Sequence, residues 1–245
     1  MKKFIPILAA IFVILIFLPK SFSGQNEDKV LTINADEISM LLYGSSNELI
    51  NGKLYLPEHP RAKGNPFYDD RSKINGTIFI KGNKYPGQVF GYNIADEKIV
   101  LNVFQKNSST QFEIELNEVM VDSMIINNTF FINSATNVVP GFEKGFVEII
   151  YKGGFLFIKK HRKTFVNQYS STSPYGFYTN DDAEYFLIYD TIPIKITSKK
   201  SLLKEFETHK KETKKYIKSV KFKFKKASSQ QWVNLLDYCD TIASN

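Results

Sequence analysis

The chain has 245 residues with a formal net charge of +7, a length that suits one β-rich domain with an appendage or two small domains. Its single cysteine, Cys239, excludes an internal disulfide framework. The charge is unevenly distributed, because thirteen lysines and only three glutamates fall in residues 195–226. Residues 195–226 therefore form one strongly basic segment, and the body of the protein, outside this segment and the N-terminal leader, is mildly acidic.

Residues 1–23 have the order of a secretory signal peptide. Lys2 and Lys3 precede an unbroken apolar run from Ile7 to Leu18, and Ser21-Phe22-Ser23 offers small residues at cleavage spacing. The run is shorter than the roughly 20 residues that a membrane-spanning helix needs. We predict a signal peptide at 1–23 and an exported protein of the periplasm, the outer membrane or the extracellular space. Without a cysteine at the leader boundary, it is not expected to be a lipoprotein.

Residues 24–196 are predicted to form an antiparallel β domain. Lys81-Gly82-Asn83-Lys84 separates two extended runs as a hairpin turn would, and Ala95-Asp96-Glu97 precedes another run. Strands are predicted at 77–80, 85–92, 98–104, 112–116, 146–151, 154–159, 185–189 and 192–196, with Pro193 suited to an edge. Short turns without intervening helices indicate an antiparallel meander, curled into a partly open barrel or folded as a sandwich.

The C-terminal segment, residues 197–245, has helical periodicity. Helices are predicted near 199–208, 210–220 and 229–242, the first capped by Ser198 and the last by a Ser-x-x-Gln capping box at 228–231. Trp232, Leu236 and Cys239 share one face of the last helix and are expected to be buried. We therefore predict a mainly β protein with about three short C-terminal α-helices docked on the sheet.

The alternating Lys221-Phe222-Lys223-Phe224-Lys225 is predicted to be a short strand or an extended connector. Residues 167–182 form the longest turn-rich stretch and are the best candidate for a mobile loop.

Several short motifs along the chain resemble those of a known group of proteins. They are Gly64-Asn65-Pro66-Phe67-Tyr68-Asp69-Asp70, Gly76-Thr77-Ile78, Gly82-Asn83-Lys84-Tyr85, Tyr92-Asn93-Ile94-Ala95-Asp96, the stretch from Ser198 to Leu203 and the ending Leu235-Leu236-Asp237-Tyr238. In these motifs the chain resembles uncharacterised exported proteins of Bacteroidota-type bacteria. The resemblance implies a β-rich, exported bacterial protein and brings no established activity or catalytic motif.

No arrangement typical of a metal or cofactor site is present. His59, His161 and His209 lie at least 48 residues apart, and none has a second ligand at zinc-binding spacing. His59 and His161 are expected to be solvated polar residues. The sequence also lacks a nucleophile elbow, a phosphate-binding glycine loop and a dinucleotide fingerprint. We predict no metal, no cofactor and no catalytic residue.

Two acidic pairs, Asp69-Asp70 and Asp181-Asp182, are the only candidates for hydrolase or calcium chemistry. Ordinary turn chemistry is the favoured interpretation of both.

Four aromatic residues in the turn-rich stretch, Tyr169, Tyr175, Phe177 and Tyr178, are candidates for a ligand-binding site, with simple packing of the loop as the alternative. Five lysines, Lys210, Lys211, Lys214, Lys215 and Lys218, occupy a broad helical face. We favour a solvated face, with contact to an anionic membrane surface as the alternative, and we expect no nucleic-acid partner.

Together these features favour a non-enzymatic binding or accessory module of the bacterial envelope, with another envelope protein as a candidate partner. A carrier of a lipid-like ligand in a β-barrel is the alternative, followed by a secreted hydrolase.

Overall fold

The computed structural model describes residues 49, 52–104, 111–137, 139–142 and 144–244, which all belong to one compact unit. The predicted signal peptide lies outside these residues. Within them, no helix has the length and apolar character needed to cross a membrane.

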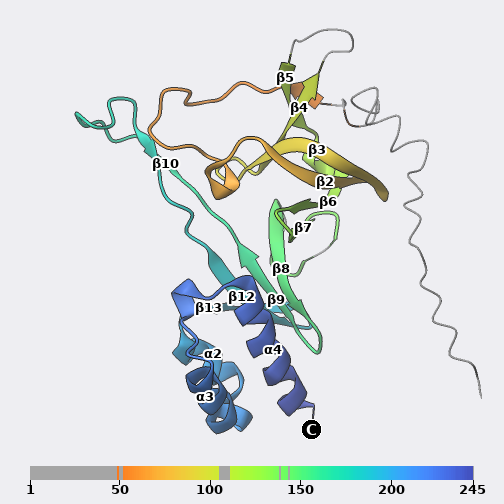
Figure 1. Cartoon of the computed structure of the whole chain (residues 1–245), viewed down its shortest axis with the longest axis vertical. Helices are drawn as coiled ribbons and strands as arrows, with labels where there is room; N and C mark the ends of the chain where they lie inside the picture. The colour runs from red at the N-terminus through yellow and green to blue at the C-terminus, as the bar shows by residue number, and fades with distance from the viewer. Residues whose placement is uncertain (1–48, 50–51, 105–110, 138, 143, 245) are drawn as a thin grey trace, which may run out of the picture. The chain divides into compact units, whose positions relative to one another are not determined.

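Eleven strands of the described chain form one antiparallel sheet in the order β1-β5-β4-β3-β2-β6-β7-β8-β9-β12-β13 (Figure 1). They are β1 Gly52–Leu54, β2 Ile74–Ile80, β3 Asn83–Asn93, β4 Lys98–Phe104, β5 Gln111–Leu116, β6 Val121–Ile126, β7 Thr129–Asn133, β8 Phe146–Lys152, β9 Leu156–Lys160, β12 Glu184–Tyr189 and β13 Ile192–Ile196. The sheet is not closed, and β1 and β13 are its edges. A separate two-stranded ladder pairs β10, Phe165–Val166, with β11, Phe177–Tyr178.

Tight turns with left-handed backbone set the registers of two hairpins. Between β2 and β3, Lys81 and Gly82 have φ angles of 48° and 79°, and Asn127 and Asn128 between β6 and β7 have 48° and 64°. Two successive positive φ angles define the turn that matches the right-handed twist of paired strands. The predicted hairpin at Gly82 is confirmed.

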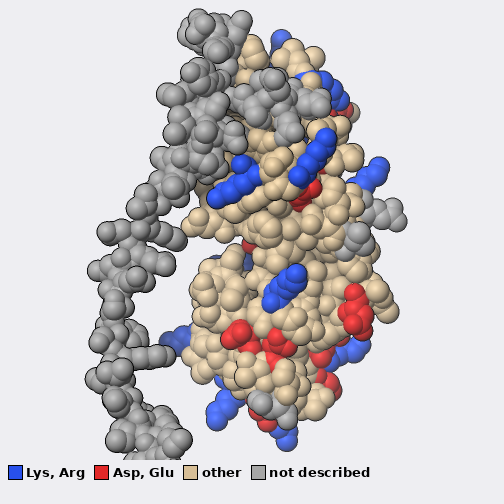
Figure 2. Space-filling model, turned by 90° about the vertical axis from the view of Figure 1, so that its right-hand side faces the viewer, with Lys and Arg blue, Asp and Glu red and all other residues tan. Residues whose placement is uncertain are grey.

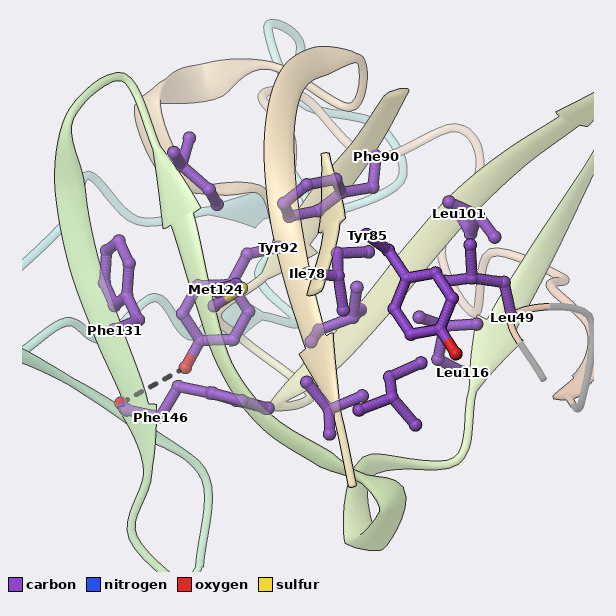
Figure 3. Close-up of a cluster of buried hydrophobic side chains, with 14 of the residues drawn as sticks. Leu49, Ile78, Tyr85, Phe90, Tyr92, Leu101, Leu116, Met124, Phe131 and Phe146 are labelled. Carbon is purple, nitrogen blue, oxygen red and sulfur yellow. Dashed lines mark hydrogen bonds between the residues drawn. The ribbon is translucent and has the colours of Figure 1, made fainter. Parts of the chain in front are cut away.

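The first half of the sheet curls around one apolar core (Figure 3). Four strand spacings separate β3 from β8 in the sheet, about 19 Å if it were flat. The hydroxyl of Tyr92 on β3 nevertheless lies 3.5 Å from the carbonyl oxygen of Phe146 on β8. The sheet must therefore bend, and side chains such as Leu101, Met124 and Phe131 fill the inside of the bend.

The three predicted C-terminal helices are confirmed as α2, Lys199–Glu205, α3, Lys210–Ser219, and α4, Ser229–Ala243. Short 3-10 turns lie at Tyr68–Asp70, Glu118–Met120, Glu207–His209 and Phe224–Lys226. Ser198 and Ser228 form the capping boxes that begin α2 and α4. A capping box satisfies backbone N–H groups that a helix start otherwise leaves unpaired.

A second core lies between the helices and β8, β9, β12 and β13. Trp232, Leu236 and Cys239 are buried in it, as the helical periodicity predicted. The α4 helix is also fixed by Asp240, whose carboxylate accepts hydrogen bonds of 2.8 Å from the Tyr151 hydroxyl and from the backbone N–H of Gly154. Burial and this carboxylate raise the pKa of Tyr151 to about 12, so its hydroxyl remains a donor.

The alternating lysines and phenylalanines of 221–225 do not form a strand. Phe222 and Phe224 both pack edge-on against Trp232, with ring centroids 4.8 and 5.2 Å away, and a 3-10 turn follows. Packing of both rings in the helical core therefore outweighs the strand preference of the alternating sequence. The segment is a connector between α3 and α4.

Candidate ligand-binding site

Lys160, the last residue of β9, and the three residues after it form a basic strap. The side chains of Lys160, His161 and Lys163 in this strap are buried. Lys160 contacts the Glu97 carboxylate at 2.6 Å and donates to the carbonyl oxygen of Phe146 at 3.2 Å. Glu97 also accepts a 2.6 Å hydrogen bond from Tyr92. The strap therefore joins the β3–β4 turn to β8 across the bend of the sheet.

His161 lies in the basic strap with 2% of its side chain exposed. Its Nε2 lies 2.8 Å from Glu148 on β8, its Nδ1 bonds to Asp181, and the ring of Tyr68 meets it edge-on. Ionised carboxylates only accept hydrogen bonds, so both ring nitrogens face groups to which they can donate. The expectation of a solvated histidine was wrong, because carboxylates distant in sequence enclose the ring.

Glu148 and Asp181 are held in their charged forms by these contacts. Burial alone would raise the pKa of Glu148, but the hydrogen bond from His161 and the charge of Lys159 outweigh it and hold the pKa below its usual value. The same balance, with bonds from His161 and the Arg162 backbone, lowers the pKa of Asp181. With both ring nitrogens occupied and both carboxylates paired, this triad has no free base to offer a substrate.

Lys163 fixes the loop that carries the first acidic pair. Its ammonium group donates to the carbonyl oxygens of Asn65 and Phe67, at 3.0 and 2.7 Å, and to Asp70 at 2.5 Å. Asp69 in turn pairs with Arg71. Both acidic pairs thus lie beside the basic strap, as ion-pair partners and turn residues.

Beyond the basic strap, the chain enters the β10–β11 ladder at Phe165. The ring of His59 stacks on Phe165 with centroids 3.5 Å apart and planes 12° apart. His59 is therefore half-buried: one face packs on Phe165, while 32% of the side chain is exposed, so the expected solvation is confirmed only in part. This stacked pair divides two open clefts.

The first cleft, which we call the tyrosine cleft, has a volume of about 330 Å³. Its lining includes Glu58, Arg61, Asn167, Tyr169 and Tyr175 together with the stacked pair. The side chains of Tyr169 and Tyr175 are 67% and 51% exposed, and the Arg61 guanidinium lies 5.4 Å above the ring of Tyr175. Two exposed tyrosine side chains thus lie among planar polar groups, with Arg61 over the ring of Tyr175.

The second cleft, of about 420 Å³, lies on the other side of the stacked pair and is lined by Asp96, Glu97, Arg162 and Tyr178 among others. Burial, followed by the Asp96 carboxylate, raises the pKa of Tyr178 to about 12. The Arg162 guanidinium lies 3.4 Å from the Glu184 carboxylate, so the charge of Arg162 already has an ion-pair partner.

The structure brings three of the four predicted aromatic site residues to this surface. Tyr169 and Tyr175 share the tyrosine cleft, and Tyr178 lines its neighbour. Phe177 pairs with Val166 in the β10–β11 ladder and lines neither cleft. The sequence did not point to Arg61 or His59; a hint was available in the short His59-Pro60-Arg61 turn, which presents an aromatic and a guanidinium together.

The turn-rich stretch that carries these tyrosines is held by its own backbone. Ser170 and Ser173 exchange two backbone hydrogen bonds, and Lys63 exchanges two more with Gly176 and Tyr178. Gly176 has a φ of 78°, and a Cβ there would lie 2.6 Å from the Phe165 ring. The stretch 167–182 thus contains a tip closed by backbone hydrogen bonds and a position that requires glycine, while its mobility stays a prediction.

Two further clefts lie elsewhere. One, of about 590 Å³, is lined by Lys159, Asp182, Lys195 and Lys225 among others, and one of about 520 Å³ lies beside β1 and is lined by Lys53, Lys98 and Glu115 among others. The five predicted surface lysines are all exposed on α3 and line none of the four clefts. Among the residues with described side chains, no group of three or more potential metal ligands converges.

Comparison of the chain with protein-family models, with curated proteins and with solved structures found no match. Function must therefore be inferred from the site itself.

Proposed function

We propose that this protein is a non-catalytic binding module, exported by a bacterium, that holds a neutral carbohydrate in the tyrosine cleft. Export is supported by the signal-peptide pattern of residues 1–23. The binding role is supported by one observation above all, the pair of exposed rings of Tyr169 and Tyr175 in one cleft.

Carbohydrate fits the chemistry of the tyrosine cleft. The face of a sugar ring carries C–H groups that stack on an aromatic ring, and its hydroxyls need both donors and acceptors. Tyr169 and Tyr175 offer the faces, while Arg61 and Asn167 offer planar donors and Glu58 an acceptor. The formal charges of Arg61 and Glu58 cancel, which favours a neutral ligand.

The alternatives have less support. A hydrolase needs a carboxyl group that can exchange a proton with substrate, whereas Asp70 and Asp181 are committed to Lys163 and His161. A carrier of a lipid-like ligand needs an enclosed apolar chamber, whereas the bend of the sheet is filled by the side chains of its core.

Affinity electrophoresis against a panel of neutral polysaccharides, including a β-glucan, a xylan and a mannan, tests the proposal. We expect at least one to retard the wild-type chain, and Tyr169→Ala and Tyr175→Ala each to weaken that retardation about tenfold, as loss of a central aromatic contact does. Tyr175→Phe keeps the ring face and should retain most of the binding.

Tyr189→Ala is the matched control, because Tyr189 is an exposed tyrosine on β12 outside the cleft. Equal weakening by Tyr189→Ala, or no retardation by any polysaccharide of the panel, would overturn the proposal. Binding of a proline-rich peptide in place of sugars would identify the cleft as a peptide groove and would also overturn it.

A further inference from the structure

The α3 helix presents a lysine stripe on its outer side. Thr213 and Ile217 are buried and mark the side that packs inward. At 3.6 residues per turn, Lys211, Lys214, Lys215 and Lys218 fall within an arc of about 100° on the exposed side of the helix. Lys210 lies at the border and pairs with Glu207 at 2.8 Å. The five-lysine face expected from sequence is therefore a stripe of four.

The four members of the lysine stripe form no ion pair within the described structure. Glu212, the one acidic residue of α3, lies three residues before Lys215. Lys211 and Lys215, like Lys214 and Lys218, are four residues apart, and like charges at that spacing repel and destabilise a helix. This repulsion contributes nothing to the stability of the helix, and a surface of negative charge would relieve it.

The surroundings of the lysine stripe extend the positive charge. The neighbouring α2 helix packs against α3 and carries exposed Lys200 and Lys204, also four residues apart. The face shown in Figure 2, by contrast, mixes acidic and basic side chains. The α4 helix adds no lysine or arginine at all and carries Asp237 and Asp240. Positive charge is therefore concentrated on the α2–α3 side of the helical segment.

The shape of this surface selects the kind of partner. No residue of α3 lines any of the four clefts described above, so the lysine stripe is a set of exposed point charges outside those clefts. Phe222 and Phe224, which could have stacked on nucleic-acid bases, are turned into the core against Trp232. Mobile lipid headgroups can rearrange to meet such charges, whereas a pocketless lysine face offers a rigid ligand no fixed geometry.

We propose that the lysine stripe of α3, with Lys200 and Lys204, attaches the protein peripherally to a bilayer surface that contains anionic lipid. The contact is independent of the tyrosine cleft. Each lysine near an anionic surface contributes about a fivefold increase in binding, so four give a preference of roughly several hundredfold at low salt. The preference falls as salt is raised, because screening acts within about 8 Å at physiological ionic strength.

Vesicle sedimentation of the full chain, with phosphatidylcholine alone and with added phosphatidylglycerol, tests the proposal at low and physiological salt. The leader, with Lys2, Lys3 and Lys20, is the same in every variant, so the readout is the change between variants in the ratio of binding to the two vesicle types. We expect the quadruple variant Lys211→Gln, Lys214→Gln, Lys215→Gln and Lys218→Gln to lose most of the preference. A matched control removes four other exposed lysines, Lys81, Lys84, Lys144 and Lys152, and should keep most of it.

Three results would overturn the proposal. They are equal binding of the wild type to both vesicle types, equal losses in the two quadruple variants, and binding of a single-stranded oligonucleotide through the lysine stripe without binding of vesicles. Circular dichroism of both variants checks that a lost preference does not come from lost folding.

Discussion

Two lysine-rich segments of this chain have opposite environments. In the basic strap, Lys160, His161 and Lys163 are buried, and each cation meets carboxylates or carbonyl oxygens from distant parts of the chain. On α3, the lysine stripe is exposed and has no acidic partner in the described structure. Two segments of similar composition thus differ in role: the basic strap joins distant parts of the fold, and the lysine stripe forms a charged surface.

The difference shows what makes a buried charge tolerable. Taking an ion out of water is costly unless an opposite charge and hydrogen bonds replace the water. Glu148 supplies that to His161, and the carbonyl oxygens of Asn65 and Phe67 supply it to Lys163. The α3 lysines have no such partners, so they remain in solvent.

The largest effect is expected from His161→Leu. This change leaves the carboxylate of Glu148, 4% exposed, with Lys159 at 3.4 Å as its remaining ionic partner. Removal of one member of a buried pair typically costs about 3–5 kcal/mol in the free energy of unfolding. Chemical denaturation measures it, with His209→Leu on the half-buried turn before α3 as the control. A loss below about 1 kcal/mol would mean that the basic strap is not a stabilising junction.

A smaller effect is expected from pH. The pKa values of Glu148 and Asp181 lie below their ordinary values of 4.5 and 3.8. As pH falls, the unfolded chain therefore binds protons before the folded chain does. The stability that these two carboxylates contribute is complete above their ordinary pKa values and is lost as pH falls through the lowered pKa values. In His161→Leu the largest cause of the lowering is gone, while Lys159 and the Arg162 backbone remain, so we expect the difference in unfolding free energy between this variant and the wild type to narrow on acidification.

Leu236→Ala is the control for this pH dependence. Leu236 is fully buried in the helical core, and its truncation should cost about 2–5 kcal/mol through lost packing. No titratable group is removed, so the gap between Leu236→Ala and the wild type should stay constant between pH 7 and pH 3.5. A gap that narrows as much as that of His161→Leu would contradict the assignment to Glu148 and Asp181.

Local features of the sequence predicted the elements of the fold well. The hairpin at Gly82, the edge position of Pro193 and the capping boxes at Ser198 and Ser228 depend on residues close in the chain. The fate of Phe222 depended instead on Trp232, which belongs to a helix that follows it. Local alternation could not reveal that competition.

The candidate site was predictable only in part. Tyr169 and Tyr175 stood out as aromatics in a turn-rich stretch, but Arg61 joins them from more than 100 residues away in the chain. His161 was missed because its partners lie 13 and 20 residues away. One signal was available: Glu148 is an acidic residue inside an apolar strand, which requires a buried cation nearby.

The smallest effect is expected from the quadruple glutamine variant of the lysine stripe. Its four lysines contact no carboxylate in the described structure, and their like-charge pairs at four-residue spacing oppose the helix. We expect the free energy of unfolding to change by less than about 0.5 kcal/mol, toward greater stability, and the gain to shrink as added salt screens the repulsion of the wild type. Thermal denaturation at low and high salt measures both. A loss of more than about 1 kcal/mol would show that the aliphatic stems of these lysines cover apolar surface, and the contrast with the basic strap would then be one of degree.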